Sequence, residues 1–265
     1  AEENAMDRVR RLEAASRIGF AAHGVVYLLI GWFAVRAALS IGSPTDAKGA
    51  LHSLVGGPFG WALLGIMALG LLCYALCGVA EALFDLHEQG DSPHGLAIRS
   101  GRFISALIHF GLAVYAAALA IGLTISGGSA KGWTAWLMAQ PYGPWMVMGV
   151  GGVVLIVAVL QARIAWTASF MEQLVISGDM RRLAETIGRT GYVARATVLA
   201  LTCVFLVSAG WNVDSSQAGG LADALRQLQQ QPYGPSMLGV VAIGLLMFGV
   251  SSFVEAAYRR LTGAI

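Results

Sequence analysis

The residues that could do chemistry in this sequence are the few ionisable side chains inside its long apolar segments. They are His23, Glu81, His109, Arg163, Arg195 and Glu255. Ionisable groups in such surroundings are costly, and they are functional candidates by default. A carboxylate and an imidazole can exchange a proton near neutral pH, so Glu81 and His23 suggest a proton or ion relay. The competing interpretation, which we favour, is a set of polar clasps between helices, with long side chains that reach toward water.

The candidate residues recur at equivalent positions, and this recurrence predicts which of them pair. Glu81 and Glu255 each lie 23 residues after a proline, where a third copy of the pattern has Ile164. Four residues after a glycine, the three copies have His23, Ser105 and Arg195. We therefore expect His23 to pair with Glu81 and Arg195 with Glu255. The alternatives are a pair of Glu255 with Arg259 on one helix, and a pair of Glu81 with Arg163.

Catalytic and metal-binding patterns are absent from the sequence. Cys73 and Cys77 share one helix face at i, i+4, but no partner lies nearby at ligand spacing. His109 has no second ligand at a matching predicted depth, which argues against haem. There is no Walker loop, nucleophile elbow, HExxH or paired Cys motif. We therefore expect no catalytic, cofactor or metal site, and we expect that the protein is not an enzyme. In particular, we expect no haem, metal or nucleotide bound at His23, His109, Cys73 or Cys77.

The elements that position these residues are six long apolar blocks. Hydrophobic residues make up 57% of the chain and charged residues 12%, about half the ~25% of a soluble domain. Each block has close to the ~20 residues that a helix needs to cross a bilayer. The sequence therefore predicts an all-α integral membrane protein. Its transmembrane helices are expected over residues 19–40, 59–83, 102–126, 143–167, 190–212 and 235–257.

The basic residues predict the orientation. With six spans both termini lie on one side, which holds thirteen of the 17 Lys and Arg residues. The other side holds Arg36, Lys48, Lys131 and Arg226. This excess predicts that both termini are cytoplasmic, in a multi-pass protein of the cell's inner (plasma) membrane. Lipid is the implied partner, and a net charge of +2 gives no reason to expect nucleic acid.

An internal repeat organises the six spans into three helical hairpins. Gly19, Gly101 and Gly191 open the odd-numbered spans, and the motifs GPFG, QPYG and QPYG open the even-numbered ones. The predicted modules are residues 11–88, 95–173 and 185–261. Each module crosses twice, so the copies must be parallel repeats, and we expect a pseudo-threefold axis along the membrane normal. Apolar residues spaced by three and four predict a short outer interfacial half-helix before each proline.

These anchors resemble the bacterial membrane family called domain of unknown function 1206, whose members carry three two-helix modules. The resemblance rests on the GF or GY opening with a small residue five positions later, and on the QPYG or GPFG step. It covers residues 11–261. The middle copy departs from the pattern because Arg102 follows Gly101. The resemblance implies a fold and a membrane location, but no activity.

Two functions remain open from the sequence. The first is a non-catalytic scaffold or an accessory subunit of a larger membrane assembly with other membrane protein subunits, favoured because no site is visible. The alternative is a transporter or channel for a small solute or ion. The predicted middles of the spans are Leu, Val, Ala and Gly rather than polar, which argues against transport. A water-filled cavity that reaches the midplane and is lined by His23, His109 or Glu81 would favour transport, whereas a dry axis filled by side chains would favour the scaffold.

Overall fold

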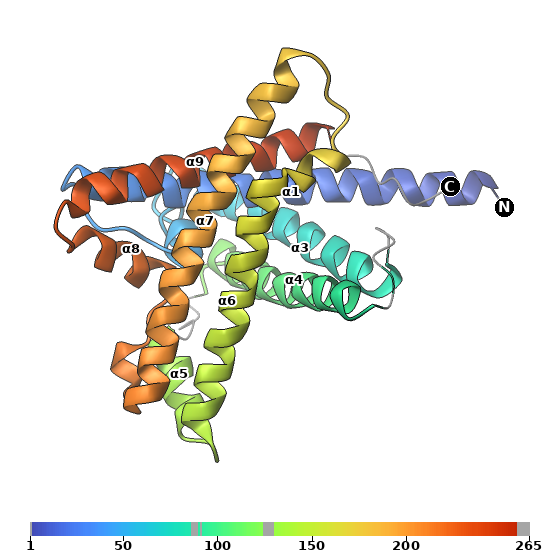
Figure 1. Ribbon diagram of the computed structural model, residues 1–265. Helices are drawn as coiled ribbons and strands as arrows, with labels where there is room; N and C mark the ends of the chain where they lie inside the picture. Colours follow the sequence, from blue (N-terminus) through green and yellow to red (C-terminus); the bar gives the residue numbers. More distant parts are fainter. Residues whose placement is uncertain (1, 86–89, 91, 124–129, 259–265) are drawn as a thin grey trace.

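The computed structural model describes residues 2–85, 90, 92–123 and 130–258, and it confirms the all-α class (Figure 1). Within these residues, a short helix precedes each of the three proline steps, and two 3-10 turns follow long helices. The six long helices are α1 (Glu2–Ala38), α3 (Gly60–Phe84), α4 (Pro93–Ala120), α6 (Gly143–Thr167), α7 (Asp179–Asn212) and α9 (Gly234–Tyr258). The shorter elements are α2 (Ala47–His52), α5 (Ala130–Met138), α8 (Leu221–Gln229), η1 (Ser169–Gln173) and η2 (Ser215–Gln217).

Each long helix contains a stretch that is long and apolar enough to cross a membrane. These stretches are Ala14–Ala38, Gly60–Phe84, Ile98–Ala120, Gly143–Thr167, Asp179–Asn212 and Gly234–Tyr258. The six predicted spans are therefore confirmed. The largest differences are at helix ends, because α1 and α7 continue into polar sequence, and α4 ends at Ala120 rather than near residue 126. Residues 124–129 lie outside the described part of the chain.

The same turn joins the short helix to the even-numbered span in all three modules. The aromatic residue after each proline, Phe59, Tyr142 or Tyr233, has a left-handed backbone with φ of 59°, 61° and 62°. The glycine that follows donates its N–H to a carbonyl three residues back, at 3.0, 2.9 and 2.7 Å. A Cβ on that glycine would collide with carbonyl oxygens of the short helix, or, at Gly60, of the turn that follows it. The predicted half-helices and the internal repeat are thus confirmed in atomic detail.

Helix packing follows a repeated rule with one exception. Each even span packs closely against the odd span of the next module, in the pairs α3–α4, α6–α7 and α9–α1. Within a module, α1 packs against α3, and α7 packs against α9, but α4 and α6 do not pack against one another over their described residues. Instead, the α6–α7 pair crosses the remaining spans steeply (Figure 1). The three hairpin modules exist in sequence, but the pseudo-threefold arrangement is not confirmed, because the middle module is open.

The side chains at equivalent positions explain why the middle module stays open. In module 1 Gly70 lies against Ala22, and in module 3 Gly244 lies against Ala194. Helices associate in lipid where such small residues let the two backbones approach. The corresponding residues of the middle module are Val153 and Ile104, whose side chains are 44% and 43% exposed. Two branched side chains in place of glycine and alanine prevent the close approach of α4 and α6.

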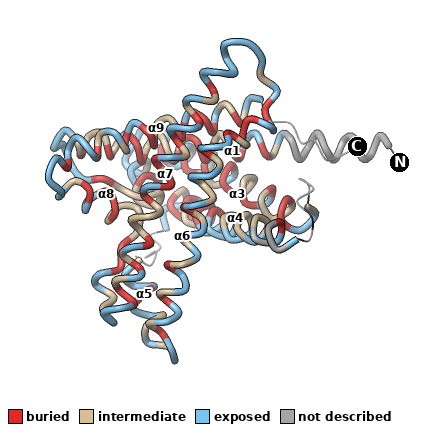
Figure 2. The backbone as a smooth tube through the Cα atoms, in the orientation of Figure 1, coloured by how far each residue is buried: buried red, intermediate tan, exposed pale blue. Residues whose placement is uncertain are grey.

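Burial elsewhere is that of a bundle surrounded by lipid. Buried residues lie where helices face each other, while the outward faces are exposed (Figure 2). The main apolar core contains Ile30, Leu71, Val198, Leu238 and Leu245. Seven tryptophan and tyrosine residues near the ends of the spans are strongly exposed, as is typical of side chains that anchor helices at a membrane interface. These are Trp61, Trp133, Trp136, Trp145, Trp211, Tyr142 and Tyr233.

The equivalent glycines Gly19 and Gly101 provide a matched test of this packing. A Cβ at Gly19 would lie 2.7 Å from the backbone of Tyr74, whereas a Cβ at Gly101 would have no atom within 4 Å. We expect Gly19→Ala to lower the free energy of unfolding by about 1–3 kcal/mol through overpacking. Gly101→Ala should be neutral, or stabilising by up to about 1 kcal/mol, because alanine favours helix. Denaturant unfolding of the two purified variants measures the difference, and equal losses would contradict the open middle module.

Candidate functional site

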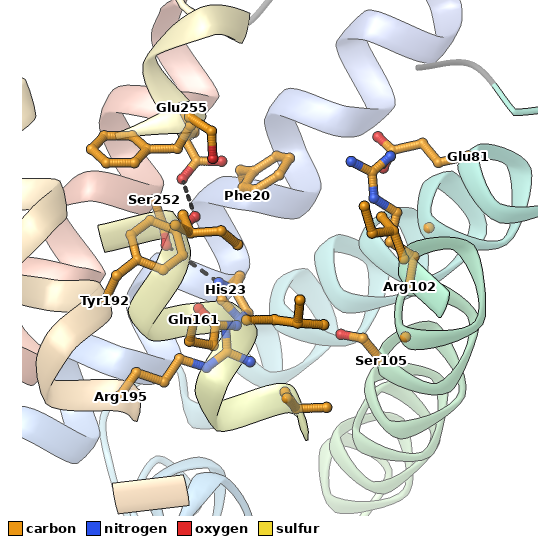
Figure 3. A pocket seen from close by; sticks show the side chains of 18 of the residues that line it. Phe20, His23, Glu81, Arg102, Ser105, Gln161, Tyr192, Arg195, Ser252 and Glu255 are labelled. Carbon is orange, nitrogen blue, oxygen red and sulfur yellow. Dashed lines mark hydrogen bonds and ion pairs between the residues drawn. The ribbon is translucent and has the colours of Figure 1, made fainter. Parts of the chain in front are cut away.

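A cavity of about 590 Å³ lies among the three modules, and all six spans contribute to its lining (Figure 3). The lining residues come from the start of each odd span and the end of each even span, for example Phe20 on α1, Glu81 on α3 and Arg195 on α7. The cavity therefore lies at the end of the bundle where the odd-numbered spans begin and the even-numbered spans end. Its position depends on the three modules together rather than on any one hairpin.

The open middle module makes room for this cavity. Gly19 packs on Tyr74 in module 1, and Gly191 packs on Phe248 in module 3. The equivalent pair in the middle module is Gly101 and Val157, and both residues line the cavity. The empty volume thus occupies the place where α4 would meet α6 if this module were closed like the other two.

Glu81 pairs with a residue of the next module rather than with His23. Its carboxylate lies 3.4 Å from the guanidinium of Arg102 on α4. The expected His23–Glu81 pair is therefore wrong. The reason is the close packing of α3 on α4, which brings the basic residue of the middle copy, where the family pattern has an aromatic, to the acid of module 1. The alternative partner Arg163 lines the same cavity but is exposed.

Glu255 and Arg195 do not form the expected ion pair within the described residues. The hydroxyl of Tyr192 donates a hydrogen bond to Glu255 at 3.3 Å. The guanidinium of Arg195 lies over two aromatic rings instead, 5.5 Å from the centroid of Tyr27 and 5.0 Å from that of Phe248. The alternative pairing of Glu255 with Arg259 falls on a residue outside the described part of the chain.

His23 lies at the floor of the cavity in an aromatic cluster. Its ring stacks on Tyr74, with centroids 4.8 Å apart and planes inclined by 4°. Nδ1 lies 3.3 Å from the hydroxyl oxygen of Ser252, and that hydroxyl donates its own hydrogen to the carbonyl of Phe248 at 3.1 Å. Since a serine has one hydrogen to donate, Nδ1 of His23 must be the donor to Ser252. In the neutral ring Nε2 is then an acceptor.

His109 lies beside His23, which corrects the expectation that no second imidazole would be found at its depth. The two ring centroids are 5.0 Å apart. His109 Nδ1 donates to the backbone carbonyl of Ser105 at 2.7 Å. Among the residues that the structure describes, no group of three His, Cys, Asp or Glu side chains is arranged to hold a metal ion. Two imidazoles alone make an incomplete metal site, so the absence of a metal at His23, His109, Cys73 and Cys77 stays a prediction.

Three buried polar atoms have no hydrogen-bond partner in the described structure, and all three belong to residues that line the cavity. They are Ser16 Oγ, His23 Nε2 and Gln161 Oε1. Buried polar atoms in proteins are rarely left unsatisfied, so each one indicates water or a ligand that completes it. The cavity wall is therefore polar, and water or a ligand in the cavity can complete the hydrogen bonds of these three atoms.

Several of these residues were not apparent from the sequence. In the sequence, Arg102 appears only as a charged residue at a membrane boundary. Nothing there identifies Gln161, Tyr192 or Ser252 as site residues. A usable signal existed for one of them, because Gln161 stands 20 residues after its proline, where the other modules have Gly78 and Ser252. The middle module, which does not close, therefore has an amide side chain at a position where the other two modules have a small residue.

The helices and the cavity define a polytopic α-helical membrane protein assembled from three tandem two-helix modules. The chain belongs to the domain of unknown function 1206 family, whose model matches residues 18–85, 100–168 and 190–259. It is 31% identical over 249 residues to a Bacillus subtilis protein described as uncharacterized protein YxxB, and this match covers 93% of the chain and 90% of the relative. No solved structure matches it significantly.

A double-mutant cycle distinguishes the observed ion pair from the expected one. We expect Glu81→Gln and Arg102→Gln to show a coupling energy of about 0.5–3 kcal/mol, because the two side chains are in contact and largely buried. The cycle of Glu81→Gln with His23→Gln should give coupling within about 0.5 kcal/mol of zero. Denaturant unfolding of the single and double variants provides both values. A larger coupling energy for Glu81 with His23 than for Glu81 with Arg102 would contradict the observed ion pair and support the expected pair within module 1.

Proposed function

We propose that the protein binds a small polar solute in the central cavity and carries it across the membrane. The supporting observation is the set of unpartnered polar atoms of Ser16, His23 and Gln161 around one cavity that all six spans line. Its volume is within the 300–1,000 Å³ typical of small-molecule sites. This proposal takes the alternative that the sequence left open, and it describes a non-catalytic protein.

The cavity weakens the argument that favoured a scaffold. That argument rested on apolar span centres, but the polar groups gather at one end of the bundle, where His23, Glu81 and Arg195 face one space (Figure 3). The other half is filled by the apolar core around Ile30 and Leu71. Transport therefore needs a second state that opens this half, and the α4–α6 gap leaves the α6–α7 pair room to move. With cytoplasmic termini, as the basic residues predict, the cavity of this state faces the cytoplasm.

A scaffold or accessory role in a larger assembly is the competing proposal, and it makes a different prediction. A scaffold retains stoichiometric partner chains when it is purified from the native membrane in mild detergent. A solute carrier has a hydrated cavity, and a side chain that blocks this cavity stops transport. The native cysteines report on the cavity without any knowledge of the solute, because Cys77 lines it and Cys203 is buried elsewhere.

We expect Cys77 to react with a small, charged methanethiosulfonate reagent at least tenfold faster than Cys203, each tested as the sole cysteine. Gly101→Trp should slow the labelling of Cys77 by tenfold or more, because the indole enters the open space beside Gly101. Gly152→Trp is the matched control, since a Cβ at Gly152 would also have no atom within 4 Å, but Gly152 does not line the cavity. Mass spectrometry of the labelled protein gives the rates.

Transport itself is measured in liposomes. Wild-type protein should accelerate the osmotic swelling of vesicles in at least one isosmotic polar solute, Gly101→Trp should abolish this increase, and Gly152→Trp should preserve it. Labelling of Cys77 that is as slow as that of a buried, unreactive Cys203 would show that water does not reach the cavity, and the proposed function would then be wrong.

A further inference from the structure

The guanidinium of Arg195 has hydrogen-bond donors that no described residue uses. It is half-buried at the cavity wall, it forms no ion pair in the described structure, and it lies over the rings of Tyr27 and Phe248. The rings attract the positive charge through their π faces. They cannot accept the five N–H groups, which lie in the plane of the guanidinium. These donors are available to a ligand in the cavity.

The two acidic residues on the spans that line the cavity are engaged by other groups, and the third acidic residue of the lining, Glu172 on η1, is exposed. Glu81 is engaged by Arg102 at 3.4 Å, and Glu255 accepts a hydrogen bond from Tyr192 at 3.3 Å. The carboxylates of Glu81 and Glu255 lie near the ends of their helices. Arg195 and His23 lie deeper in the cavity, at its floor (Figure 3). A guanidinium prefers a planar oxyanion, which it can bind through two parallel hydrogen bonds. The floor of the cavity therefore presents a positive group that fits a carboxylate or a phosphate.

The floor of the cavity also presents hydrogen-bond acceptors that have no donor among the described residues. Nε2 of His23 is the acceptor nitrogen of the neutral ring, because Nδ1 donates to Ser252, and Nε2 has no partner among the described residues. Oε1 of Gln161 is likewise unpartnered there. Both are satisfied by a hydroxyl or amino group but not by a second oxyanion. The ligand thus needs a hydrogen-bond donor as well as a negative charge.

We infer that the cavity floor binds a small organic anion that also carries a hydroxyl or amino donor, with its carboxylate or phosphate on Arg195 and its donor on His23. This inference rests on the proposed function and specifies the class of solute. The same chemistry occurs in a free metabolite and in a lipid headgroup. Both sources fit a cavity of this volume, so the test includes both.

Isothermal titration calorimetry of the whole chain in detergent tests the anion. The probes are lactate, propionate, glycerol 3-phosphate, glycerol and an oleoyl lysophosphatidic acid. We expect lactate or glycerol 3-phosphate to bind if the source is a free solute, and lysophosphatidic acid alone if it is a lipid. Glycerol should not bind. Arg195→Gln should weaken the binding anion at least tenfold, and Arg195→Lys, which keeps the charge but loses the planar fork, should weaken it less.

Arg226→Gln is the matched control, because Arg226 pairs with Asp223 on α8, away from the cavity. It should bind the anion like the wild type. A monodisperse elution profile is required of each variant, and Arg195→Lys carries the test if Arg195→Gln does not fold. Binding that is unchanged in the folded Arg195 variants, or no binding of any anion, would overturn the inference.

A second comparison tests the role of His23. His23→Phe keeps an aromatic ring to stack on Tyr74 and removes Nε2. Wild-type protein should prefer lactate to propionate, which lacks the hydroxyl, and His23→Phe should reduce this preference at least fivefold without changing the affinity for propionate. If the preference for lactate over propionate were unchanged in His23→Phe, His23 would not contact the ligand. If Cys77 is accessible and Gly101→Trp blocks it, yet no anion binds, the proposed function stands and the anion specificity alone is wrong.

Discussion

Close approach of helix backbones through small residues is the constraint on which the rest of this structure depends. Lipid is as apolar as the helix surfaces, so burial in water does not drive the spans together. Glycine and alanine at facing positions supply the packing instead, as in the contacts of Gly70 with Ala22 and Gly244 with Ala194. Where Val153 and Ile104 replace them, the helices stay apart, and this single difference between modules creates the cavity.

The cavity then determines which polar groups are satisfied. Spans that pack closely complete each other's polar side chains, as Arg102 of α4 does for Glu81 of α3. The wall left by the α4–α6 gap has no such partner among the described residues, which leaves atoms of His23 and Gln161 without hydrogen bonds and Arg195 without an ion pair. Unsatisfied polar groups lower the stability of the fold. Their presence around one cavity is explained if a molecule in the cavity completes their hydrogen bonds.

The three copies of the repeat therefore have different tasks. Modules 1 and 3 close on Gly19 and Gly191 and supply the aromatic and imidazole floor of the cavity. The middle module uses the same anchor, Gly101, to line an open space. A protein with three identical, closed modules would have a filled axis, so the departure of one copy from the pattern is the structural basis of the site.

The sequence by itself determined the class, the six spans, the proline turns and the three-fold repetition, because span length, hydropathy and turn chemistry act locally along the chain. It also identified His23, Glu81, Arg195 and Glu255 as intramembrane polar groups. The tertiary structure alone decided their partners. The sequence suggested that residues of one hairpin would meet, but the closest helix pairs join successive modules, which brings Arg102 to Glu81. Arg195 lies over the rings of Phe248 in its own module and Tyr27 in module 1 instead of pairing with Glu255. Pairing depends on which helix faces come together, and that is settled by the fit of small and branched side chains across the whole bundle.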